Sequence, residues 1–269
     1  MSGSFHVFAL VPSRAAPPDP WPSGLERGAV TLLPVGLLTA VAQRVSCEFL
    51  ARLQQGGAGE AGRAWLTDRL LEHEQVVEGF VAAGPTFPLG FGVLVADPEA
   101  LRGAVAPNFD MLSAFFAGAV GRQEWCLKFY LREEAPRRGE MALAARGGLD
   151  YLAARRALPE RQAARDAAGR DWVDRTLARL RPLCEAVVGH EAGTAPGKGL
   201  KLLANLALLV CGAETAAMLS AVEALVTPAA QDGLELTLTG PWPLYSFRPR
   251  IALGAALLDC ASEPDRVPA

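Results

Sequence analysis

The chain has 269 residues, of which 51% are hydrophobic and 20% charged, and its formal net charge is −3. This length suffices for one large domain or two ordinary ones, and this composition excludes wholesale disorder. The weakly acidic balance excludes a general affinity for nucleic acid or for an anionic membrane surface.

The five cysteines are scattered, odd in number and never in C-x-x-C spacing. This pattern indicates reduced thiols rather than a disulfide framework or a zinc site. The amino-terminal residues show no secretory signal, and the longest apolar run, Leu202–Ala213, is too short to cross a bilayer. We therefore expect a cytoplasmic protein that does not contact membranes.

The first half of the chain predicts a mixture of strands and helices. Strand-forming residues cluster at Phe5–Val11, twice within Ala29–Ser46, and at Thr86–Ala96. Residues 12–24, "PSRAAPPDPWPSG", form a proline-rich segment that reads as a stiff surface connection. Apolar residues at helical spacing predict a helix over Trp65–Val81.

A further helix should follow the Thr86–Ala96 strand. Asp97 is a suitable N-cap and Pro98 suits the first helical position. This helix should run to about Val120 with an interruption near Pro107, and Gly121 marks the boundary of the first half.

The second half predicts the order strand, helix, strand, helix, strand. Strands are expected at Glu124–Leu131, Leu202–Cys211 and Gly233–Gly240, with helices in 132–181 and after Cys211. This order fits a ferredoxin-like sheet backed by helices, although the sequence does not place its fourth strand.

An apolar stripe at helical spacing ends the long helical region. Its members are Val173, Leu177, Leu180, Cys184 and Val187, with Pro182 inside it as a kink or a helix end. The stripe predicts packing on the sheet or, alternatively, self-association through a helix pair.

The sequence shows no active site. His6, His73 and His190 have no second ligand at metal-binding spacing, so no metal is predicted. The run "GTAPGKGLK" at Gly193–Lys201 lacks both the spacing and the hydroxyl of a phosphate-binding loop. We therefore expect no catalytic residue and no cofactor, and a role in binding or assembly.

Several segments together resemble the GvpL/GvpF family of gas vesicle synthesis proteins over nearly the whole chain. They are "HVFALVP" near the start, "LLEHEQVVEGFVAAGPTFPLGFGVLV" at Leu70–Val95, "EWCLKF" at Glu124–Phe129, "GGLDYLAARR" at Gly147–Arg156, and "GPWPLYSF" at Gly240–Phe247. The closing motif is the most specific of them. Two positions depart from the family pattern: Gly90 replaces an arginine and Leu244 a proline.

The resemblance implies an α+β fold of two domains, with an N-terminal α+β domain and a C-terminal domain of modified ferredoxin-like type with an extended tail. On this chain the expected divisions are residues 1–121, 122–247 with a long helical insertion, and a C-terminal extension 248–269. The motif positions expected to serve structure or partner binding are His73, Pro88, Phe91, Gly92, Trp125, Lys128, Tyr151, Leu152, Gly240, Pro241, Trp242, Pro243, Tyr245, Ser246 and Phe247.

The resemblance also implies a non-enzymatic role in the assembly of gas vesicles. The expected partners are the small amphipathic shell protein and other vesicle accessory proteins, and the expected location is the cytoplasm and the gas vesicle. A different hypothesis is a ferredoxin-like module that binds a small regulatory ligand. A third is an enzyme with Gly193–Lys201 as its nucleotide site.

The closing motif allows two interpretations. Gly240 can leave its strand at any φ, and Pro241 and Pro243 hold the backbone extended around Trp242. The aromatic rings could pin the tail into a groove between the two domains of the same chain. Alternatively, part of this aromatic surface receives the shell protein.

Overall fold

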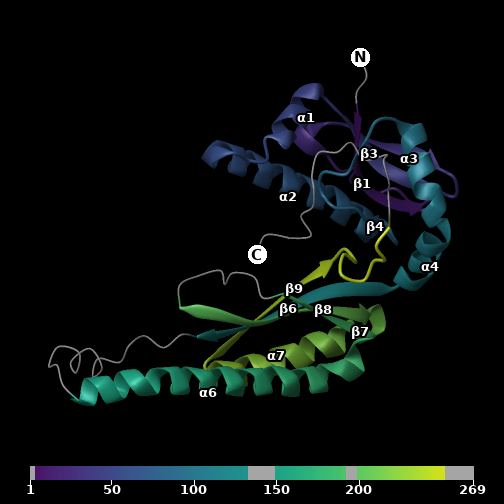
Figure 1. Ribbon diagram of the computed structural model, residues 1–269. Coiled ribbons are helices and arrows are strands. Elements are labelled where there is room, and N and C mark those ends of the chain that lie inside the picture. The colour runs from purple at the N-terminus through teal and green to yellow at the C-terminus, as the bar shows by residue number, and fades with distance from the viewer. Residues whose placement is uncertain (1–3, 133–148, 192–198, 252–269) are drawn as a thin grey trace. The chain divides into compact units, whose positions relative to one another are not determined.

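A computed structural model describes residues 4–132, 149–191 and 199–251, with side chains from residue 159 onward in the helix that starts at Leu149. These residues form an α+β fold with two antiparallel sheets, which confirms the predicted class (Figure 1). The described residues up to Gln123, together with those from Trp242 onward, form one compact unit. Glu124–Pro241 form the other. The domain limits drawn from the sequence stay a prediction.

The sheet of the first unit has β1 (Ser4–Pro12) in its interior. On one side β1 pairs with β3 (Leu38–Val45), and β3 pairs with the edge strand β2 (Val30–Val35). On its other side β1 pairs with two short strands, β4 (Phe87–Pro88) and β5 (Leu94–Val95). The single strand predicted over Thr86–Ala96 is therefore interrupted between these two.

Helices cover both faces of this sheet (Figure 1). One face packs on α1 (Cys47–Gln54) and α2 (Gly59–Ala83), the other on α3 (Pro98–Val105) and α4 (Phe109–Ala119). Alternation along β1, shifted by one residue at an irregularity between Val7 and Ala9, explains this. Phe8 faces the α1–α2 side, whereas Val7 and Leu10 face the α3–α4 side. A strand buried on both faces is continuously apolar, as "FHVFALV" is.

The local sequence predicted the start and the end of α3 correctly. The Asp97 carboxylate accepts hydrogen bonds from the N–H groups of Glu99 (2.9 Å) and Ala100 (2.8 Å), and Pro98 follows it. The predicted interruption is a short 3-10 turn at Ala106–Asn108.

The second unit has the element order β6 (Arg122–Arg132), α6 (Leu149–Leu180), β7 (Ala186–His190), β8 (Leu200–Cys211), α7 (Thr215–Gln231) and β9 (Leu234–Trp242). Its strands lie in the order β7-β8-β6-β9. This strand–helix–strand–strand–helix–strand order with the first strand inside the sheet is the ferredoxin-like arrangement. Alternate residues of β6 point toward α6 and α7, which lie on one face of the sheet (Figure 1).

The structure corrects the predicted helical stripe and thereby supplies the missing strand. Leu180 ends α6, a 3-10 turn spans Arg181–Leu183 with Pro182 inside it, and Val187 lies in β7. Strand and helix patterns coincide over a few apolar residues, so periodicity extended the helix too far. Leu180 is fully buried in the core of its own unit, and Leu177 packs beside it. The stripe residues therefore pack within their own unit, and self-association stays a prediction.

Candidate functional site

The motif residues fall on four parts of the fold. His73 of α2 lies beside the turn between β4 and β5, which carries Phe91 and Gly92. Two further positions lie on β6, and the closing motif starts in β9 and continues past it. Tyr151 and Leu152 fall within α6, but their side chains lie outside the described part.

Two buried histidines hold the turn between β4 and β5. The His73 Nε2–H donates to the Leu89 carbonyl across 3.0 Å, and the Gly92 N–H donates to His6 Nε2 across 3.1 Å. The two imidazole rings meet edge to face with centroids 5.2 Å apart, and Phe91 packs against both. Both side chains are fully buried. His6 and His73 therefore replace the ladder bonds that the interrupted strand lacks.

The pKa values of both histidines favour the neutral ring. Burial lowers the pKa of His73 from 6.5 to about 4, although its bond to Leu89 opposes this shift. Burial, followed by repulsion from His73, lowers the pKa of His6 well below 6.5. A neutral His6 that accepts at Nε2 carries its proton on Nδ1, whereas His73 carries its proton on Nε2. This arrangement suits structure rather than acid–base chemistry.

The two glycines of the "PLGFG" segment have different surroundings in this turn. Gly92 has a φ of +88°, which a larger residue rarely adopts, and its N–H is bound to His6. A Cβ added at Gly90 would meet nothing within 4 Å. The first side-chain atom of another residue at this position would therefore meet no close neighbour.

The two motif residues on β6 lie in the core of the second unit or beside it. Trp125 is 9% exposed and belongs to that core, whereas Lys128 is half-buried on the same strand. Gly240 packs directly on Trp125, because a Cβ there would lie 3.0 Å from the Trp125 ring and from the Glu124 carbonyl. With a φ of +137°, Gly240 takes a conformation that favours glycine.

The tail after β9 is anchored on the first unit. The Tyr245 hydroxyl donates to the Glu74 carboxylate of α2 across 3.0 Å. The Arg248 guanidinium lies over two rings, 5.7 Å from that of Tyr245 and 5.8 Å from that of Phe87. Ile251 packs against the core on the α3–α4 side of the sheet. The tail is thus part of the packing of this unit.

Burial raises the pKa of Glu74, and the nearby Glu78 carboxylate raises it further, while the bond from Tyr245 opposes both. Burial, followed by the Glu74 charge, raises the pKa of Tyr245. The phenol therefore stays protonated and keeps its donor hydrogen.

The other residues of the closing motif differ in exposure. Trp242 is 37% exposed, whereas Pro243 and Leu244 are buried and Ser246 and Phe247 are half-buried. Trp242 is the aromatic of this motif that offers the most surface to another molecule.

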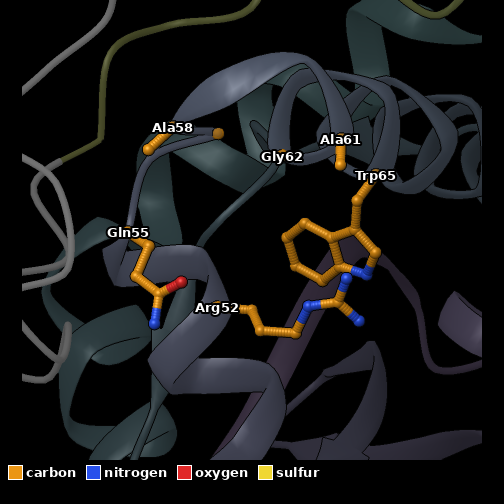
Figure 2. A pocket seen from close by; sticks show the side chains of 7 residues that line it. Arg52, Gln55, Ala58, Ala61, Gly62 and Trp65 are labelled. Atoms are coloured by element: carbon orange, nitrogen blue, oxygen red, sulfur yellow. The ribbon is translucent and has the colours of Figure 1, made fainter.

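A shallow pocket of about 180 Å³ lies between the end of α1 and the start of α2 (Figure 2). The Arg52 guanidinium stacks on the Trp65 ring at 4.7 Å, and Figure 2 shows the two side chains facing each other. The Trp65 Nε1–H donates to Glu26 across 3.1 Å. These contacts tie α1 and α2 together, and we assign the pocket no ligand.

A larger open groove of about 590 Å³ lies between Ala16–Ser23 and the C-terminal half of α2. The proline-rich segment predicted as a surface connection forms one wall of it. Sequence reasoning missed this groove, and it also missed Glu74, Arg248 and the role of His6. The prolines around Trp21, which is exposed, were the sequence feature that could have predicted the groove. No sequence pattern predicts that His6 contacts residue 92.

The described residues contain no group of three or more His, Cys, Asp or Glu side chains placed to hold a metal ion. Within the same part of the chain, no helix is both long and apolar enough to cross a bilayer. Lys198, in the run considered for nucleotide binding, lies outside the described residues.

Comparison with known proteins gives consistent matches. The family model "Gas vesicle synthesis protein GvpL/GvpF" matches residues 4–249. Gas vesicle protein L of Streptomyces sp. (strain CB03234) is 30% identical over 196 residues, which cover 68% of this chain and 70% of that protein.

Two crystal structures share the fold. GvpF of Anabaena sp. PCC7120 matches with a TM-score of 0.65 and 18% identity, over 93% of this chain and 97% of that one. GvpF of Microcystis aeruginosa matches with a TM-score of 0.64 and 16% identity, over 93% of this chain and all of that one.

Proposed function

This chain belongs to the GvpL/GvpF family of gas vesicle synthesis proteins, structural proteins rather than enzymes, and we propose that it binds the small amphipathic shell protein during vesicle assembly. In this role it is a cytoplasmic assembly factor or a minor component of the vesicle. Other vesicle accessory proteins are further partners in the proposal.

The observation that carries this proposal is the apolar character of two helix surfaces. α7 has one charged residue, Glu223, among 17, and exposes Leu219 and Val226. α4 has one charged residue, Asp110, among its 11 residues, and it exposes Met111. The outer face of a helix in a soluble domain is normally rich in charge, so such surfaces favour contact with an apolar partner.

A shell subunit must keep apolar surface available until it polymerises. A partner that covers this surface would suppress aggregation before assembly. Exposed apolar helix faces on a folded protein fit that task, because they bury apolar area without a large conformational change.

The motif residues divide between two roles in this proposal. His73, Phe91, Gly92 and Tyr245 stabilise the first unit through the contacts described above. We assign the partly exposed Trp242 to partner contact.

The test is capture of the shell protein by the tagged full chain after co-expression. Wild type should retain the shell protein, and Val226→Lys, which adds a charge to an exposed apolar position, should retain less. Trp242→Ala reports on the tail, with thermal melting to show that each variant is folded. A wild-type chain that retains no shell protein would contradict direct binding.

A further inference from the structure

We propose that the groove between Ala16–Ser23 and α2 is the docking site for an apolar segment of the shell protein that carries a basic side chain. This inference rests on the proposed function for the identity of the partner. The groove differs from the helix faces of α4 and α7 because it has both a concave shape and a charge that selects its occupant.

The floor of the groove consists of small residues on one face of α2. Gly79, Ala82 and Ala83 lie three and four positions apart, so they share a surface on which no side chain is larger than a methyl group. Glycine inside a helix is unfavourable relative to alanine. A Cβ at Gly79 would lie 3.8 Å from Pro22, an ordinary contact, so packing against the wall does not require glycine. Glycine at position 79 leaves this part of the floor without a side chain.

The wall opposite the helix is stiff. Pro17, Pro18, Pro20 and Pro22 restrict the backbone of the segment, so little conformational entropy is lost when a partner binds to it. Trp21 is 44% exposed, and its ring meets that of Phe80 edge to face at 5.7 Å. A fixed, half-exposed tryptophan at the rim of an apolar groove is typical of residues that dominate binding.

The charge of the groove is acidic. Among its lining residues Asp19 is the single charged one, and it is exposed. Glu78 is also exposed and lies on the same helix between Gln75 and Ala82, three and four positions from them. The other lining residues are apolar except for Ser23 and Gln75, which are neutral. Two carboxylates beside such a surface favour an occupant with a basic side chain next to its apolar ones.

The size of the groove suits a short segment rather than a whole domain. Its volume of about 590 Å³ lies within the range of about 300–1,000 Å³ that ligand pockets usually have. A few apolar side chains from one helix face or one extended strand would fill it.

The experiment measures co-purification of the shell protein with the tagged full chain carrying single substitutions in the groove. Ala82→Lys places a bulky positive charge on the floor at an exposed position, and Asp19→Lys reverses the selecting charge. We expect about tenfold less shell protein with Ala82→Lys, because the new side chain fills the floor and repels a basic occupant. With Asp19→Lys we expect less shell protein and a weaker dependence on salt.

The matched control is Leu71→Lys, which adds the same charge to α2 at a position that is 57% exposed and outside the groove. It should retain shell protein like wild type. Unchanged retention by Ala82→Lys would overturn the groove as docking site while leaving the proposed function intact. No retention by wild type would overturn the proposed function and this occupant together.

A second variant, ended after Ile251, distinguishes an occupant within the same chain. If the shell protein is the occupant, deletion of residues 252–269 should leave the effect of Ala82→Lys unchanged. If the deletion raises retention and abolishes that effect, the chain's own C-terminal extension fills the groove, which would overturn the proposal.

Discussion

The hydroxyl of Tyr245 and the carboxylate of Glu74 are joined by a hydrogen bond of 3.0 Å across 171 residues of sequence. It fixes the closing motif to α2, with Arg248 over the Tyr245 ring on the tail side. The specific motif of the family thus contributes to the stability of the first unit.

Tyr245→Phe should lower the free energy of unfolding by about 1–2 kcal/mol, because the partly buried Glu74 loses its donor. Urea denaturation of the wild type, Tyr245→Phe, Glu74→Gln and the double variant measures the coupling between the two side chains. Additive effects of the two single substitutions would show that the bond contributes nothing.

Acid should destabilise the first unit through its buried histidines. The pKa of His73 is lowered from 6.5 in the unfolded chain to about 4 in the folded one, so the unfolded state binds more protons in this interval. Stability is therefore full above pH 6.5 and falls as the pH drops toward about 4. The 2.5-unit interval between 6.5 and about 4, at about 1.4 kcal/mol per pH unit, limits the loss from His73 to about 3–4 kcal/mol. The lowered pKa of His6 acts in the same direction.

His73→Gln isolates this effect, since the glutamine amide can still donate to the Leu89 carbonyl but does not titrate. Glu74 acts in the opposite direction, because its raised pKa stabilises the folded state as the pH falls, and it is present in both proteins. Thermal melting between pH 7.5 and 4 should show a smaller loss for His73→Gln. Parallel curves would exclude His73 as the titrating group.

Gly90→Arg should change stability by less than about 0.5 kcal/mol, because its Cβ meets no atom within 4 Å. Gly92→Ala is the matched comparison in the same turn and should cost about 1–2 kcal/mol, because its φ is +88°. Chemical denaturation of both variants measures the difference. A large loss for Gly90→Arg would mean that the turn depends on glycine at both positions.

Gly240→Ala should destabilise the second unit by about 1–3 kcal/mol, because its Cβ would lie 3.0 Å from the Glu124 carbonyl and the Trp125 ring. Gly103→Ala, in α3 with open space around it, should instead stabilise the protein by about 0.5–1 kcal/mol. The two melting temperatures should move in opposite directions. A common direction would show that local packing does not decide the outcome.

Local patterns in the sequence determined much of the fold, because they depend on neighbours within one element. The N-cap at Asp97 and the apolar β1 run follow from residues a few positions apart, as does most of the element order of the second unit. The family resemblance was also available from the sequence, and the match over residues 4–249 confirms it.

Only the tertiary structure decided which distant residues meet. It divided the predicted Thr86–Ala96 strand into β4 and β5, because His6 and His73 supply bonds that a continuous strand would make itself. It ended α6 at Leu180 and turned Val187 into a strand residue, since pairing with β8 outweighed helical spacing. It also placed Tyr245 on Glu74 and the proline-rich segment on α2. These outcomes depend on burial and on hydrogen bonds between residues far apart in the chain, which local periodicity does not encode.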